Sequence, residues 1–116
     1  MSVIPAELRE TSDNPCPPWC ACEPGHGYEA TTLDDRKRLI RYHTGHQTQL
    51  SLAVGGTAGV EIATEESADR KERDVRLSAP AVQLWATGEL TVHEALSLSD
   101  MLARAAMELR KIEAGQ

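Results

Sequence analysis

Cysteine and histidine residues are concentrated in one third of the chain, and this clustering constrains the fold more than any other feature. The stretch from Cys16 to His46 holds all three cysteines and three of the four histidines of the 116-residue sequence. In a reducing compartment, clustered thiols and imidazoles more often indicate a metal site than a disulfide framework. The stretch therefore predicts a metal-binding loop in the N-terminal part of the chain.

Zinc usually takes four thiolate or imidazole ligands in a tetrahedron, and the stretch offers six candidates. Cys16 and Cys20 have a spacing found in structural zinc sites. His26 lies on a loop rich in glycine and proline, which leaves it free to orient. His46 can replace His43, and the extra thiol of Cys22 leaves the third ligand open. The preferred zinc ligands are Cys16, Cys20, His26 and His43.

The segment that carries the first two cysteines is stiff. Pro15, Pro17 and Pro18 exclude a helix there, because proline lacks an N–H donor and pushes the preceding residue toward an extended conformation. The thiolates are thus presented with little conformational entropy left to lose. Trp19 lies between them, and we expect it to pack over the site, to anchor the core, or both.

Composition gives a physical reason for such a site. A chain of this length forms one small domain. Its apolar residues include many alanines and few aromatic residues, with no Phe, two Trp and two Tyr. A core of this kind buries little area and benefits from a metal, a disulfide or dimerisation. The sequence shows no signal peptide or membrane span, so we expect a cytoplasmic protein. The predicted organisation is a flexible arm over 1–14, a single α+β domain over 15–113 and a tail over 114–116.

The charge pattern argues against nucleic acid as a partner. The net charge is −6, and an acidic chain does not attract the phosphate backbone through its overall field. Arg36, Lys37, Arg38 and Arg41 form a local basic cluster, which we interpret as a solvated turn. A DNA-associated regulator remains a minor alternative that requires these four residues to share one exposed face.

Short alternating segments predict an antiparallel sheet. Residues 47–54 alternate in polarity, glycines over 55–59 indicate a hairpin turn, and residues 60–64 form the returning strand. Further strands are expected over 39–42, leading into His43, and over 75–85, interrupted by Pro80. A single helical turn over 33–37 and an exposed, charge-dense loop or helical turn over 65–74 complete this part.

The clearest helix is predicted over 91–113. Thr91 and Glu94 form a capping box, and apolar residues recur at three- and four-residue steps. At about 1.5 Å per residue the helix is about 34 Å long, more than the width of so small a sheet. Met101 and Met107 are spare methionines, in that they lie outside this apolar repeat. They either meet a second chain or fill gaps in the core. The expected fold is α+β, with a small antiparallel sheet, a zinc-pinned N-terminal loop and one long C-terminal helix.

Function is less constrained than fold. The leading hypothesis is a small zinc-binding, non-enzymatic interaction or regulatory module, with a protein partner or a homodimer through the C-terminal helix and no membrane contact. The alternative is a metal-dependent or thiol-redox enzyme. The sequence around Trp19 and Cys20 is similar to the Trp-Cys-x-x-Cys of thioredoxin-like proteins but is one residue short. Glu23 and Glu29 lie near the predicted ligands, yet the signatures of zinc hydrolases and deaminases are missing.

The short Cys-Pro-Pro-Trp-Cys core, the histidines that follow it and the opening of the C-terminal helix resemble a family of short, uncharacterised actinobacterial proteins. That family has a Cys-Pro-x-Trp-Cys…His signature and a domain of unknown function. The resemblance covers about residues 15–112, and Cys22 is a departure from it. It implies a small α+β domain and no particular activity. The zinc ligands that it implies are Cys16, Cys20, His26 and His43.

Overall fold

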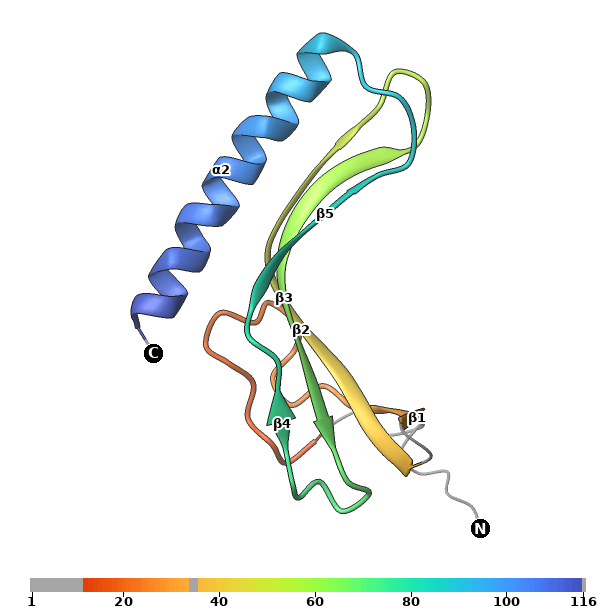
Figure 1. The fold of residues 1–116 in the computed structure, drawn as a ribbon, viewed down its shortest axis with the longest axis vertical. Helices are drawn as coiled ribbons and strands as arrows, with labels where there is room; N and C mark the ends of the chain where they lie inside the picture. Colours follow the sequence, from red (N-terminus) through yellow and green to blue (C-terminus); the bar gives the residue numbers. More distant parts are fainter. Residues whose placement is uncertain (1–11, 34–35, 116) are drawn as a thin grey trace. The chain divides into compact units, whose positions relative to one another are not determined.

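The computed structural model describes residues 12–33 and 36–115 of the chain. It confirms the predicted α+β class, with an antiparallel sheet followed by a C-terminal helix (Figure 1). Within the described residues, no helix is both long enough and apolar enough to cross a membrane. The elements are β1 (Glu29–Leu33), β2 (Arg36–Ser51), β3 (Thr57–Ala68), β4 (Arg76–Leu77), β5 (Ala81–Ala86) and α2 (Val92–Ala114).

The strands form a five-stranded sheet in the order β1-β2-β3-β4, with β5 also paired to β3. β4 and β5 occupy successive parts of β3, since Leu77 pairs with Glu66 and Ala81 pairs with Ala63. Pro80 lies between β4 and β5, as expected for a residue that cannot donate to a ladder of hydrogen bonds.

The hairpin between β2 and β3 turns earlier than predicted. The Leu52 N–H donates to the Gly56 carbonyl oxygen and closes the turn over 52–56, rather than 55–59. Gly55 and Gly56 have φ values of 102° and 85°, a backbone conformation that residues other than glycine strongly disfavour. A Cβ on Gly56 would also lie 2.2 Å from Thr87 Oγ1. The turn therefore requires glycine at Gly56 for two reasons.

Two other predictions on the strands were wrong. Leu33 ends β1 and pairs with Arg36 at the start of β2, so the described residues of the expected helical turn over 33–37 are in strands. β3 continues to Ala68, so the expected exposed loop over 65–74 begins within a strand, and Glu66 in that strand is buried. Residues 34–35, between β1 and β2, lie outside the described residues.

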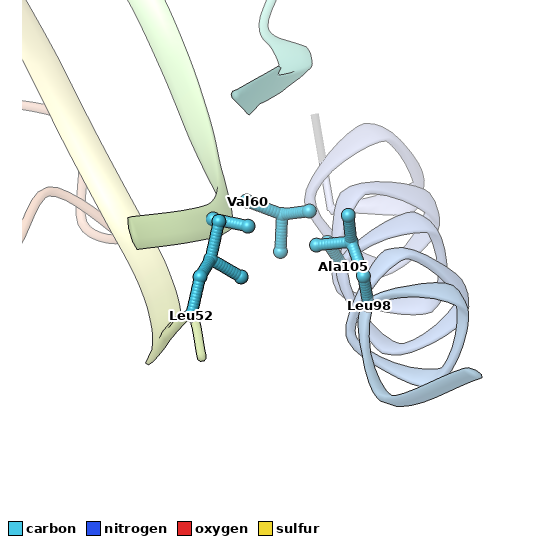
Figure 2. Packing of buried hydrophobic residues seen from close by; sticks show 5 residues of the cluster. Leu52, Val60, Leu98 and Ala105 are labelled. Carbon is cyan, nitrogen blue, oxygen red and sulfur yellow. The ribbon is translucent and has the colours of Figure 1, made fainter. Parts of the chain in front are cut away.

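The chain divides into two compact units, each described by itself: residues 1–43 with 64–79, and residues 44–63 with 80–116. The second unit has an aliphatic core in which Leu98 and Ala105 of α2 meet Val60 of β3 and Leu52 (Figure 2). Glycine at position 59 allows close packing, because a Cβ there would lie 2.7 Å from the Trp85 ring.

The C-terminal helix confirms its predicted start. The Thr91 side chain accepts a hydrogen bond from the Glu94 N–H, and the Glu94 carboxylate accepts one from the Thr91 N–H. The same carboxylate accepts a 2.7 Å hydrogen bond from the Ala53 N–H. The capping box thus ties the helix to the turn before β3. Of the two spare methionines, Met101 packs against the core and Met107 is exposed.

The first unit has a smaller apolar cluster of Tyr28, Leu39 and Ala68. Beside it, Arg41, His43 and Glu66 are at most 2% exposed. Residues 12 and 14, at the end of the expected arm, hydrogen-bond to Glu72 and Tyr28; the remainder of that arm, residues 1–11, lies outside the described residues. Residue 116 of the predicted tail also lies outside them. This unit therefore combines few apolar contacts with a buried polar network.

Candidate metal centre

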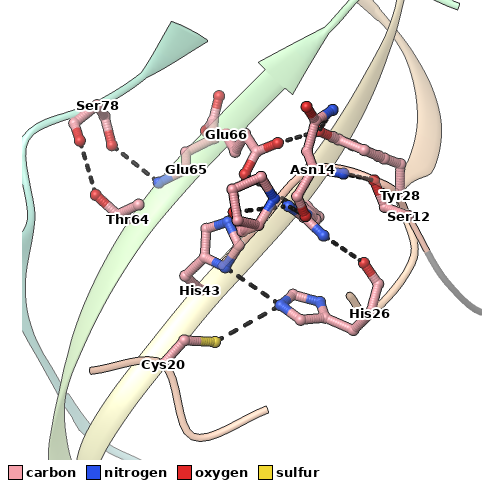
Figure 3. A network of polar contacts seen from close by, with 12 residues as sticks. Ser12, Asn14, Cys20, His26, Tyr28, His43, Thr64, Glu65, Glu66 and Ser78 are labelled. Carbon is pink, nitrogen blue, oxygen red and sulfur yellow. Dashed lines mark hydrogen bonds and ion pairs between the residues drawn. The ribbon is translucent and has the colours of Figure 1, made fainter. Parts of the chain in front are cut away.

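The four preferred ligands meet in the first unit. The ligand atoms of these side chains all lie within 4.8 Å of one another. The Sγ atom of Cys20 lies 3.6 Å from Nε2 of His26, which in turn lies 3.2 Å from Nδ1 of His43. Figure 3 shows the sulfur of Cys20 and the two imidazole rings directed toward one another. The residues are Cys16, Cys20, His26 and His43.

These separations match those of ligands around one tetrahedral ion. With Zn–S near 2.3 Å and Zn–N near 2.0–2.1 Å, tetrahedral angles place a sulfur and a nitrogen about 3.5 Å apart and two nitrogens about 3.3 Å apart. The Cys20–His26 and His26–His43 separations are 3.6 and 3.2 Å. The four residues therefore fit a tetrahedral metal ion without rearrangement of these three side chains.

Local turns bring the loop ligands together. The Cys20 N–H donates to the Pro17 carbonyl oxygen, which closes a tight turn between the two cysteines. The His26 N–H donates to the Glu23 carbonyl oxygen across a second turn, in which Gly25 has a φ of 71°. The left-handed conformation at Gly25 is one that glycine adopts without strain. The proline and glycine residues of the loop thus form the turns that carry Cys20 and His26 into the cluster.

The fourth side chain comes from the sheet. His43 lies within β2, which continues past the strand predicted over 39–42, and its side chain is fully buried. His46, the alternative ligand, is not among the four residues that converge. Its backbone has a φ of 47°, which interrupts the regular conformation of β2. The structure thus brings His43, and not His46, to the loop ligands.

Cys22 also stays outside the group of four. It is half-buried, forms no disulfide, and lines a surface pocket together with Cys16, Cys20 and other residues of the segment 12–25. Burial raises the pKa of the Cys20 thiol, and a hydrogen bond from the Cys22 backbone acts in the opposite direction. The pKa of Cys20 is raised overall, so metal binding at this sulfur must displace its proton.

The surroundings of His26 favour the neutral form that coordination requires. Burial lowers the pKa of His26, and the neighbouring His43 and Arg41 lower it further. Two thiolates and two neutral imidazoles carry a charge of −2, which balances a divalent cation. The cluster can therefore hold such an ion without net charge.

Sequence reasoning missed the polar network beneath His43. Glu66 Oε1 lies 2.5 Å from Nε2 of His43 and accepts a 3.1 Å hydrogen bond from Nε of Arg41. Glu66 Oε2 accepts a hydrogen bond from the Tyr28 hydroxyl. Burial alone would raise the pKa of Glu66, but the hydrogen bonds from Tyr28, His43 and Arg41 lower it below its usual value. Burial and the contact with Glu66 raise the pKa of Tyr28 to about 12, so its hydroxyl remains a donor.

Arg41 of β2 links the loop to the sheet through hydrogen bonds. Its guanidinium donates to the backbone carbonyl oxygens of His26, at 2.7 Å, and Asn14, at 2.8 Å, and lies 4.8 Å from the centre of the Tyr28 ring. The interpretation of this arginine as part of a solvated basic turn was wrong. Because Arg41 is 2% exposed and Arg38 is paired with Asp74, the basic residues do not form one exposed face.

The two carboxylates that lie near the predicted ligands in sequence are not buried. Glu23 and Glu29 are both exposed. The carboxylate that reaches a predicted ligand is Glu66, which already accepts three hydrogen bonds. Trp19 is half-buried, and its indole N–H makes no hydrogen bond to the described residues.

The fold and the site define a small α+β domain with two cysteines and two histidines placed closely enough to bind a metal ion. The chain belongs to a family described as a domain of unknown function, DUF6907, whose family model matches residues 2–115. Comparisons with curated proteins and with solved structures found no match.

Proposed function

We propose that the chain is a zinc-binding interaction module in which the metal has a structural role. The observation that carries the proposal is the convergence of four protein ligand atoms within 4.8 Å, two sulfurs and two nitrogens. Thiolate and imidazole donors in a tetrahedron favour zinc over harder cations, which prefer oxygen. Four protein ligands complete the coordination of the ion, whereas catalytic zinc sites keep a position for water. This favours a structural role over the enzymatic alternative.

The small apolar cluster of the first unit explains why a metal is needed. Tyr28, Leu39 and Ala68 form that cluster, while Arg41 and Glu66 bring charges into the interior beside it. Burying charged groups is costly even when they are paired. A bound ion links the loop that carries Cys16 to the strand that carries His43, so its binding energy becomes folding energy. We also propose a cytoplasmic location, because the three cysteines form no disulfide and a reducing compartment keeps thiols reduced.

Metal analysis of the purified protein tests the structural role. We expect one zinc per chain and, after removal of zinc by a chelator, a lower melting temperature that returns when zinc is added. Protein purified without metal that melts at the same temperature with and without added zinc would contradict the proposal. A reversible loss of structure on chelation also separates this role from thiol-redox chemistry, in which zinc is not required for folding.

The interaction role is supported by the outer face of α2. Val92, Leu96 and Met107 are 79%, 66% and 56% exposed, and their spacing places them on one side of a helix with 3.6 residues per turn. Leu98 and Ala105 occupy the opposite side. We propose a second copy of this chain as the partner, because an apolar stripe along a helix can pack against its own copy across a two-fold axis.

The mass in solution tests the dimer. Sedimentation equilibrium of the wild type is expected to give twice the 12.7 kDa chain mass, and Leu96→Glu is expected to give the monomer mass. Leu84→Glu is the matched control, because Leu84 is 55% exposed on β5 and lies outside this face. A monomeric wild type, or equal dissociation of both variants, would contradict the proposed dimer.

A further inference from the structure

We infer that Glu66 is a positioning residue that fixes which nitrogen of His43 binds the metal. This inference deepens the proposed zinc site and rests on it. The Nε2 atom of His43 lies 2.5 Å from Oε1 of Glu66, whereas Nδ1 of the same ring lies 3.2 Å from Nε2 of His26. The two ring nitrogens thus face different partners (Figure 3). A neutral imidazole has one protonated nitrogen and one with a free lone pair.

Glu66 determines where that proton lies. A carboxylate accepts hydrogen bonds but donates none when ionised. The nitrogen that faces Glu66 must therefore carry the proton, which leaves the lone pair of Nδ1 directed toward His26 and the cysteines. Carboxylates that accept from a metal-bound histidine in this way fix the tautomer and the ring orientation, and they increase the basicity of the ligand.

The surroundings of Glu66 hold its carboxylate in place. Arg41 and Tyr28 donate to its two oxygens, and both donors are nearly fully buried. Arg41 also donates to the carbonyl oxygen of His26, a ligand from the loop. One buried ion pair therefore contacts the metal ligands from the sheet and from the loop, so the cluster is pre-organised before an ion arrives.

A sequence feature supports an inward-facing role for these residues. Leu39, Arg41 and His43 are alternate residues of β2, and alternate residues of a strand face the same side. Glu66 and Ala68 have the same relation on β3, and all five are buried. The charged members thus occupy positions that an apolar core would otherwise fill.

Nuclear magnetic resonance of the zinc-loaded wild type tests the inference without a mutation. Long-range ¹H–¹⁵N correlations of the His43 ring are expected to show a proton on Nε2 and metal coordination through Nδ1. Coordination through Nε2, or an unprotonated Nε2, would overturn the inference. If the wild type binds no zinc, the proposed function itself fails, so the two failures are distinguishable.

Zinc affinity of variants gives a second test, measured by competition with a chelator. Glu66→Ala is expected to weaken zinc binding by about 10- to 100-fold. Glu66→Gln is expected to restore much of this loss, because its amide oxygen can still accept from Nε2 of His43. The control Glu65→Gln changes an exposed neighbour on β3 and is expected to retain wild-type affinity.

A destabilised control separates positioning from a general loss of structure. Leu39→Ala weakens the apolar cluster of the same unit without removing any atom of the Glu66–His43 contact. We expect a larger loss of zinc affinity from Glu66→Ala than from Leu39→Ala when the two are compared at equal loss of stability. Equal losses would overturn the positioning role. If Glu66→Ala does not fold even with zinc, the His43 tautomer of the wild type decides the question.

Discussion

Cys20 is the side chain whose replacement best separates metal ligands from bystander thiols. Its sulfur lies 3.6 Å from a predicted imidazole ligand, whereas Cys22, two residues further on, is outside the group of four. Cys20→Ser is expected to lose zinc and to lower the melting temperature by roughly 10 °C or more, since each kcal/mol lost corresponds to about 4 °C in a chain of this size. Elemental analysis and thermal unfolding measure both effects.

The matched control for that prediction is Cys22→Ser. The serine variant retains the hydrogen bond from the Cys22 backbone to Cys20, and its hydroxyl can replace the thiol in the side-chain contact. It is therefore expected to keep one zinc and to melt close to the wild type. A Cys20→Ser protein with full zinc content would show that the ligand set is wrong.

Arg41 gives the second prediction at this scale. Its ion pair with Glu66 is buried, with side-chain exposures of 1% and 2%. Arg41→Met leaves the carboxylate without its cationic partner and is expected to reduce the free energy of unfolding by about 3–5 kcal/mol, measured by urea denaturation with zinc saturating. Arg76→Met removes an exposed ion pair with Asp74 and is expected to change the free energy of unfolding by less than about 1 kcal/mol. Similar losses from both variants would contradict the buried role of Arg41.

The ligands of the cluster could be predicted from sequence, but the buried charged residues that hydrogen-bond to them could not. Cysteine and histidine are recognisable as ligands wherever they gather. Glu66 lies in a charge-dense segment that is typical of an exposed loop, and Arg41 lies among other basic residues. The available signal was the strand alternation, because a residue two positions before a buried His43 must face the same side.

Among the elements, α2 was the most predictable, because its capping box and apolar period are local signals.

The start of α2 also yields a pH prediction. Hydrogen bonds from the Thr91 and Ala53 N–H groups lower the pKa of Glu94 below the ordinary value of 4.5. The carboxylate therefore stabilises the fold above the unfolded-state pKa, and this stabilisation is lost as the pH falls through the lower folded-state pKa.

A carboxyl titration followed by carbon resonances measures this directly. Glu94 is expected to titrate below 4.5 in the folded protein and near it in urea. Thr91→Ala, which removes the hydroxyl of the capping box, is expected to reduce the free energy of unfolding by about 1 kcal/mol. A Glu94 midpoint at or above the unfolded value would contradict the capping role.

The strands were less predictable than the helix. Their existence follows from alternating polarity, but their ends depend on pairing partners distant in sequence. β3 extends through Glu65, Glu66 and Ser67 because β4 pairs with it there, and no local propensity indicates that pairing. In the same way, β1 is formed by pairing with the first residues of β2, where sequence alone favoured a helical turn.

For the whole molecule, the two compact units differ in what stabilises them. The unit that holds the candidate metal site has a small apolar core, whereas the unit that holds α2 has an aliphatic core of its own. Zinc removal is therefore expected to increase amide exchange more in residues 39–43 and 64–68 than in 92–114. Hydrogen exchange with and without a chelator measures this. Uniform acceleration, or greater acceleration in α2, would contradict a local structural role for the metal.

We propose that one zinc ion is held by two cysteines and two histidines of this chain. X-ray absorption spectroscopy at the zinc edge of the purified protein tests it most directly. We expect two sulfur neighbours at about 2.3 Å and two nitrogen neighbours at about 2.0–2.1 Å. Absence of zinc, or a coordination shell with oxygen in place of one of these four ligands, would contradict it.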